Sequence, residues 1–164
     1  MTLIELIAVM ALLAVVMTLS APVLSRFFRG RALTEEARRM LALTRYARSE
    51  AISRSEPMEV WINPNQRTYG LRVQAGFGSE DEKKKPVEYD LQEGLSFELA
   101  GDVLDDQGNA RIVFLPDGSI GEESLEMVRI WNEVEREAIE VAKNDTVGAY
   151  VIQEYSEKTA KSRK

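Results

Sequence analysis

The residues of this chain that could do chemistry are almost all carboxylates. The sequence contains 27 Asp and Glu residues but no histidine and no cysteine. Histidine is the commonest general base and metal ligand at neutral pH, so its absence argues against nucleophilic triads and zinc sites. No two carboxylates stand out as an acid and a base among so many. We therefore predict no catalytic residue, no cofactor and no metal ligand, and a chain that is not an enzyme.

One carboxylate, Glu5, has an unusual position at the head of an apolar run. From Leu6 to Ser25 the sequence has 20 residues without a charge. At a rise of about 1.5 Å per residue, a helix of this length spans the roughly 30 Å hydrocarbon core of a bilayer. A secretory signal peptide would have a basic segment before its apolar core, whereas nothing basic precedes this one and the chain continues into more helix. We predict a membrane-spanning helix over residues 1–25.

A carboxylate inside a membrane needs a partner or a route to water, because it costs on the order of 2.5 to 3.5 kcal/mol at the centre of a span and less near an end. The nearest cation is the α-amino group of Met1, which the helix holds on a different turn, so a neighbouring copy could bring its own terminus closer. Two such charges about 4 Å apart attract by about 4 kcal/mol at an effective dielectric near 20, and desolvation offsets this gain. The pattern favours helices packed side by side with a lengthwise stagger. The alternative, with equal weight, is that Glu5 reaches into the lipid head groups.

The first residues resemble a known family. The run Met1-Thr2-Leu3-Ile4-Glu5-Leu6, followed by an apolar helix with Pro22, is similar to the mature N-terminus of type IV pilin-like proteins after removal of a basic leader ending in glycine. In that family the first residue is usually an N-methylated phenylalanine, the fifth is glutamate, and a proline near position 22 loosens the helix during assembly. The resemblance implies N-methylation of Met1, subunit contacts through Met1, Thr2 and Glu5, and a helix kink at Pro22.

The resemblance also implies partners and a location. The partners are other pilin or pseudopilin subunits, a prepilin peptidase, the inner-membrane assembly platform and the lipid bilayer. Arg26, Arg29 and Arg31 directly after the span would by the positive-inside rule keep the following domain in the cytoplasm. A removed leader would have carried positive charges of its own, so we expect a single-pass protein of the bacterial inner membrane with its globular domain in the periplasm.

Charge divides sharply along the chain. Residues 26–54 contain eight arginines and three glutamates, a net charge of +5, whereas residues 55–164 have a net charge of −10. This asymmetry favours contact between the basic segment of one subunit and the acidic domain of another, or between the basic segment and anionic lipid. The alternative is a helix face that is only solvated.

The run Lys83-Lys84-Lys85 and the cations of the tail could contact phosphate, but the acidic domain argues against nucleic acid as a partner. The tail cations are Lys158, Lys161, Arg163 and Lys164.

A second amphipathic segment, residues 26–56, continues the helix. Its apolar residues recur at steps of three and four, which predicts one stripe resting on a globular domain. The stripe consists of Leu33, Ala37, Met40, Leu41, Ala47 and Ala51. Pro22 and Gly30 bracket a predicted kink or melted stretch, because both residues are costly in helix interiors. The helix should end before Pro57.

After Pro57 the pattern changes to that of strands, which predicts a β-rich domain over residues 57–155 and a disordered tail over residues 156–164. We expect one mainly antiparallel sheet, with turns at Asn63-Pro64-Asn65-Gln66, Pro116-Asp117-Gly118-Ser119 and Asn144-Asp145 and a charged loop from Gly76 to Pro86. The predicted strands are 58–62, 68–73, 95–99, 111–115, 127–131, 138–142 and 148–155. The predicted fold class is α+β, a long N-terminal helix packed on a small antiparallel β domain.

Two features of this domain have competing interpretations. Asp102, Asp105 and Asp106 before Gly108 resemble a calcium loop, but their spacing misses the alternation of acids in an EF-hand and favours an Asp-rich turn. Trp61 and Trp131 are interpreted as core residues, with an exposed contact for a partner as the alternative.

The order of elements is similar to that of the H-type minor pseudopilins of type II secretion and the related minor pilins. It combines a long helix, an early hairpin with a tryptophan, and a strand that runs into the turn Pro116-Asp117-Gly118. The resemblance implies a structural subunit whose helix leaves the membrane to enter a filament. The alternatives are a solitary single-pass protein whose domain binds a ligand or DNA without polymerising, and a membrane-tethered enzyme with an acid-only site.

Overall fold

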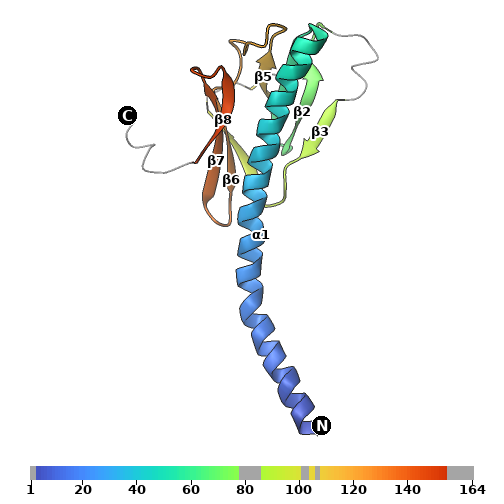
Figure 1. Cartoon of the computed structure of the whole chain (residues 1–164), viewed down its shortest axis with the longest axis vertical. Coiled ribbons are helices and arrows are strands. Elements are labelled where there is room, and N and C mark those ends of the chain that lie inside the picture. The colour runs from blue at the N-terminus through green and yellow to red at the C-terminus, as the bar shows by residue number, and fades with distance from the viewer. Residues whose placement is uncertain (1–2, 78–85, 101–103, 106–107, 155–164) are drawn as a thin grey trace. The chain divides into compact units, whose positions relative to one another are not determined.

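The computed structural model describes residues 3–77, 86–100, 104–105 and 108–154. The chain divides into two compact units, Met1–Ala32 and Leu33–Lys164, which are described separately below. One helix, α1, runs from Leu3 to Arg54, and eight strands follow it within the described residues (Figure 1).

Helix α1 ends where the sequence predicts. Ser55 has a positive φ of 55° directly after the last helical residue, and Pro57 follows two residues later. Proline cannot continue a helix, and the residue before it avoids helical angles, which explains the end at Arg54. The helix is continuous through Pro22 and Gly30. A melted stretch between them is therefore absent, and the kink at Pro22 stays a prediction.

The first sheet is antiparallel and has the strand order β3-β2-β1-β5. Its strands are β1 (Met58–Asn63), β2 (Thr68–Val73), β3 (Val87–Asp90) and β5 (Ala110–Phe114). The β1–β2 hairpin is the predicted one, with Trp61 opposite Gly70.

The second sheet is also antiparallel and has the order β4-β6-β7-β8. Its strands are β4 (Leu95–Leu99), β6 (Met127–Asn132), β7 (Glu137–Asn144) and β8 (Ala149–Glu154).

The predicted single sheet is wrong, because the strands form two sheets of four. The hairpin β1–β2 recruits the later strand β5, whereas β6 pairs with the earlier strand β4. Such pairings between segments distant in the chain have no local signal. Strand β3 was not predicted either. It has four exposed residues at the sheet edge and lacks the buried alternation that marks a strand in sequence.

One hydrophobic core joins the second half of α1 to both sheets. The predicted helix stripe is confirmed, with all its residues buried except the half-buried Leu41. The partners of the stripe in this core include Val60 and Ile112 of the first sheet and Val128 and Ile130 of the second. The α+β class and the antiparallel pairing are thus confirmed.

Candidate assembly site

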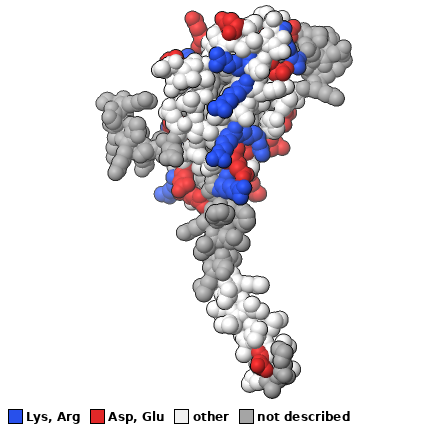
Figure 2. Space-filling view, viewed as in Figure 1, with Lys and Arg blue, Asp and Glu red and all other residues white. Residues whose placement is uncertain are grey.

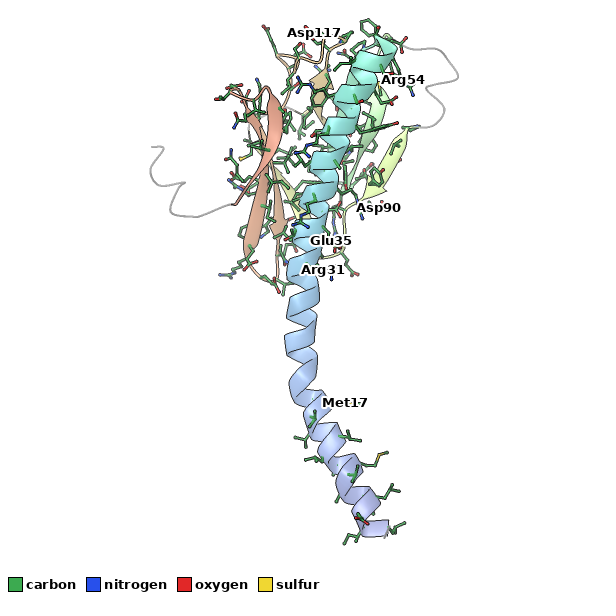
Figure 3. The ribbon with its side chains drawn as sticks, viewed as in Figure 1. Met17, Arg31, Glu35, Arg54, Asp90 and Asp117 are labelled. Carbon is green, nitrogen blue, oxygen red and sulfur yellow. The ribbon has the colours of Figure 1, made fainter. Side chains whose placement is uncertain are left out.

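The first unit presents apolar side chains to its surroundings along the whole described part of the helix. Every large apolar side chain from Leu3 to Met17 is at least 47 % exposed, and these side chains project to both sides of the helix up to Met17 (Figure 3). A helix that is apolar on all sides is typical of one that is buried in a protein assembly or a membrane. Within the described residues, no helix combines the length and apolarity needed to cross a membrane.

The predicted contact residues of this unit are only partly described. Glu5 lies in the first turn of α1, where a carboxylate is favoured by the positive end of the helix dipole, and its side chain is exposed. Met1 and Thr2 lie outside the described residues. Pro22 is helical, and its side chain also lies outside the description. The proposed pairing of Glu5 with Met1 therefore stays a prediction.

In the second unit, several arginines of the predicted basic segment are exposed on α1. Arg38 and Arg45 are seven residues apart, which places them on one side of the helix, and both are exposed. Figure 2 shows Lys and Arg side chains in a row along the helix over this domain. Arg48 is half-buried at the edge of the row and donates a hydrogen bond to the carbonyl oxygen of Gly148, at 3.2 Å.

Sequence reasoning missed Glu36, which is completely buried rather than part of the solvated basic segment. Its carboxylate accepts hydrogen bonds from the hydroxyl of Tyr69 on β2 and from Arg39 Nη1, the latter at 3.2 Å. A signal was present, because position 36 is three residues after Leu33 and four before Met40 and so falls on the apolar stripe. A charge at such a position requires a buried partner, and Tyr69 provides it.

Burial and the neighbouring Glu36 carboxylate raise the pKa of Tyr69, so its hydroxyl stays protonated and donates. For Arg39, burial acts to lower the pKa, but Glu36 and Tyr69 outweigh it and raise the pKa above its usual value. The Arg39 guanidinium also lies 5.8 Å from the ring centroid of Tyr89 on β3. These contacts tie α1 to the edge of the first sheet.

A shallow groove of about 310 Å³ lies in the second unit, between α1 and two turns. Its charged lining residues are Arg48, Lys143, Asp117 and Asp145. Hydrogen bonds from the hydroxyl and the backbone amide of Ser119 lower the pKa of Asp117. Lys143 Nζ lies 3.5 Å from Glu126 and 3.7 Å from Asp145. The charges of the groove thus compensate one another.

The structure describes some of the remaining predicted features, namely the tryptophans and part of the Asp-rich segment. Trp61 is buried and Trp131 half-buried, in line with the interpretation as packing residues. Asp105 Oδ1 accepts a hydrogen bond from the amide of Asn109 at 2.8 Å, as in a turn. Asp102, Asp106, Lys83-Lys84-Lys85 and the tail lie outside the described residues. In the part of the chain that is described, no three acidic side chains converge as a metal site would require.

Comparison with known proteins points to one family. The profile of the family "Type II transport protein GspH" matches residues 36–144. No curated protein sequence matches the chain.

Two groups of solved structures have the same fold. The minor pseudopilin EpsH of the type 2 secretion system of Vibrio cholerae has a TM-score of 0.54 at 14 % sequence identity, covering 74 % of this chain and 96 % of its own. The type IV minor pilin FimU of Pseudomonas aeruginosa has a TM-score of 0.55 at 16 % identity, covering 79 % of this chain and 92 % of its own.

Proposed function

This chain belongs to the type II transport protein GspH family, the H-type minor pseudopilins among the type IV pilin-like proteins, and we propose from this premise how it works in a filament. It is a minor pseudopilin or minor pilin, a structural subunit of a filament in type II secretion or a type IV pilus-like system. The family and the fold are those of structural subunits rather than enzymes. The observation that carries the proposal is the combination of the family match over the domain with an N-terminal helix whose apolar side chains are exposed.

In the first step, residues 1–25 hold the subunit in the inner membrane as a single pass, with the domain in the periplasm. The sequence supports this step, because no charge interrupts the run from Leu6 to Ser25. The exposed apolar side chains of the helix then exchange lipid contacts for contacts with neighbouring helices, and the helices form the filament core.

In the second step, Glu5 sets the lengthwise position of the subunit. Its carboxylate pairs with the α-amino group of Met1 on an adjacent subunit, and Thr2 contributes hydrogen bonds. In a low-dielectric environment, a charge without its partner is energetically costly. Every lengthwise position of the helix that separates Glu5 from the Met1 ammonium group is therefore unfavourable, and the pair selects one stagger between neighbouring helices. Pro22 provides a kink that lets the helix adapt, because proline removes one backbone hydrogen bond of the helix.

The test is the variant Glu5→Gln, produced from the full gene in the native cells. We expect normal membrane insertion but loss of filament incorporation, because the amide cannot pair with the Met1 ammonium group. Glu5→Asp keeps the charge and should retain part of the incorporation. Glu88→Gln removes an exposed acid of β3 instead and should incorporate normally. Normal incorporation of Glu5→Gln would remove the role assigned to Glu5.

Mass spectrometry of the N-terminal peptide from the same membranes tests the processing of the chain by prepilin peptidase. We expect a basic leader cleaved before Met1 and one methyl group on its α-amine. An unprocessed and unmethylated chain would instead favour a solitary membrane-anchored domain. That hypothesis also predicts that the domain without residues 1–25 keeps its full binding activity.

A further inference from the structure

Strand β3 is an edge of the first sheet and pairs with β2 on one side. Among the residues that the structure describes, no strand pairs with its other side, and Figure 1 shows β3 outermost beside β2. The edge of a sheet presents free backbone N–H and C=O groups, and these can pair with an extended segment of another chain. Strand β3 is therefore a candidate binding surface.

The pairing with β2 determines which backbone groups of β3 are free. The amide of Leu91 donates to the carbonyl oxygen of Arg67 at 2.8 Å, and the register of the two strands continues from this pair. In an antiparallel ladder, hydrogen-bonded and non-hydrogen-bonded pairs alternate. Tyr89 therefore turns its backbone groups towards β2, whereas Glu88 and Asp90 turn theirs outward from the edge.

The two faces of β3 differ in character. Tyr89 lies on the side of α1, because its ring is 5.5 Å from that of Tyr69 and 5.8 Å from the guanidinium of Arg39. Val87 lies on the same side as Tyr89, two residues away in the strand. Val87 is 39 % exposed and Tyr89 36 %, so this apolar side of the edge is only partly covered.

The opposite face of β3 carries Glu88 and Asp90, which are both exposed. Neither carboxylate makes an ion pair or a side-chain hydrogen bond with another described residue. The edge strand β4 differs in this respect, because its Glu98 lies 2.8 Å from Arg129. The acids of β3 are thus available to a cationic partner.

We propose that β3 binds an extended segment of a partner protein in which basic and apolar residues alternate. The segment adds to the edge as an antiparallel strand, like every other pairing in this sheet. Residues directly opposite each other in such a pair share one face, so lysine or arginine fits opposite Glu88 and Asp90. The residues between them lie on the side of Val87 and Tyr89, where a β-branched or aromatic side chain fits.

The acids also discriminate between strands. A second copy of β3 would bring its own carboxylates against Glu88 and Asp90, and like charges that lie opposite each other destabilise a sheet. The net charge of −10 over residues 55–164 favours a cationic partner in the same direction. The inference goes beyond the proposed function, because it assigns the domain a partner chemistry that does not involve residues 1–25.

The probe for the experiment is a synthetic, fluorescently labelled peptide with blocked ends and the sequence valine-lysine-valine-lysine-valine. Fluorescence anisotropy measures its binding to the full chain in detergent. The control peptide has the same composition but places its two lysines next to each other, on opposite faces of a strand. We expect it to bind roughly tenfold more weakly. The amides of Glu88 and Asp90 should exchange more slowly in the complex with the alternating peptide.

Methylation of the peptide backbone separates strand addition from simple charge attraction. In the antiparallel register the lysine amides face β3 and the valine amides face away. N-methylation of the two lysine amides should therefore weaken binding roughly tenfold, because backbone hydrogen bonds provide the affinity of an added strand. N-methylation of two valine amides should leave binding unchanged.

Charge reversal tests the assigned acids. Glu88→Lys with Asp90→Lys should weaken binding of the alternating peptide roughly tenfold or more, because like charges then lie opposite each other. A peptide with glutamate in place of both lysines should bind this variant instead. The control is Glu122→Lys with Glu133→Lys, which reverses two exposed acids outside β3 and should bind the lysine peptide normally.

Equal binding of the alternating and the control peptide, or an equal loss in the two protein variants, would overturn the proposal. Binding that appears only after deletion of residues 155–164 would equally overturn it, because the basic tail of the chain itself would then occupy the edge. The assay involves no filament, so either result would leave the proposed function to be decided by Glu5→Gln.

Discussion

At the residue scale, the least expected feature is a glutamate without solvent exposure on the apolar stripe of a helix. The buried position of Glu36 is tolerated because its two carboxylate oxygens accept hydrogen bonds from Tyr69 and Arg39. A buried acceptor that loses its donor costs far more than a satisfied hydrogen bond contributes. Glu36 therefore determines which residue of β2 must face the helix, and it links α1 to the first sheet more specifically than apolar contacts do.

The variants Glu36→Gln and Tyr69→Phe test this link. Each should lower the free energy of unfolding of the full chain in detergent by about 1–3 kcal/mol, because each leaves a buried polar group unsatisfied. The double variant should cost less than the sum of the two by about 0.5 kcal/mol or more, since the groups interact directly. Denaturant unfolding of the four proteins measures this coupling. Additive effects would show that Glu36 and Tyr69 stabilise the domain independently.

The buried tyrosines also predict a loss of stability at alkaline pH. Burial raises the pKa of Tyr69 and Tyr150 above the usual value of 10.0, with contributions from Glu36 and Glu126 respectively. The unfolded chain then loses these protons at a lower pH than the folded chain, so the stabilisation is complete below pH 10 and declines above it. Each tyrosine contributes a slope of up to about 1.4 kcal/mol per pH unit.

The double variant Tyr69→Phe with Tyr150→Phe should flatten this decline in denaturant unfolding measured from pH 9 to pH 11. Tyr46→Phe is the control, because Tyr46 is 51 % exposed. An equally steep decline in the double variant and in the control would contradict the assignment to the buried tyrosines.

At the element scale, the first sheet depends on a close approach between β2, β3 and a tryptophan. A Cβ atom at Gly70 would lie 2.1 Å from the carbonyl oxygen of Val87 and 2.8 Å from the ring of Trp61. Gly70 is therefore the position that allows the indole to cover β2 while β3 pairs at the edge. Strand β3 is short and exposed, so this pairing is the most vulnerable of the sheet.

The variant Gly70→Ala should displace β3, because the new methyl group meets backbone rather than a movable side chain. We expect a loss of about 1–3 kcal/mol in the free energy of unfolding and faster amide exchange at Val87–Asp90. Gly148→Ala is the control. Its φ of 61° also penalises a side chain, but a Cβ there meets nothing within 4 Å, so β3 should keep its protection. Unchanged exchange in Gly70→Ala would show that the sheet accommodates the methyl group.

At the scale of the whole molecule, the chain combines a domain with its own core and a helical segment with exposed apolar side chains. Among the side chains that the structure describes, all buried hydrophobic residues of the core lie at or beyond Leu33. Under the proposed function, assembly would use the first 25 residues and recognition would use the domain, so the two could change independently.

This division predicts that residues 29–164 fold alone. Their free energy of unfolding should match that of the domain in the full chain in detergent within about 0.5 kcal/mol, because the described core begins at Leu33 and is retained. Denaturant unfolding followed by tryptophan fluorescence measures both. A broad, non-cooperative transition of the shortened chain would contradict the independence of the domain.

The features with a local signal were predictable from the sequence. The helix end at Arg54 follows from Pro57, the stripe from Leu33 to Ala51 follows from its period, and the β1–β2 hairpin follows from the Asn-Pro-Asn turn between two apolar runs. The separation of the strands into two sheets, the pairing of β3 with β2 and the partner of Glu36 were decided only in the tertiary structure. The physical reason is that backbone preference and solvent exposure act over a few neighbouring residues, whereas strand pairing and buried hydrogen bonds join residues tens of positions apart.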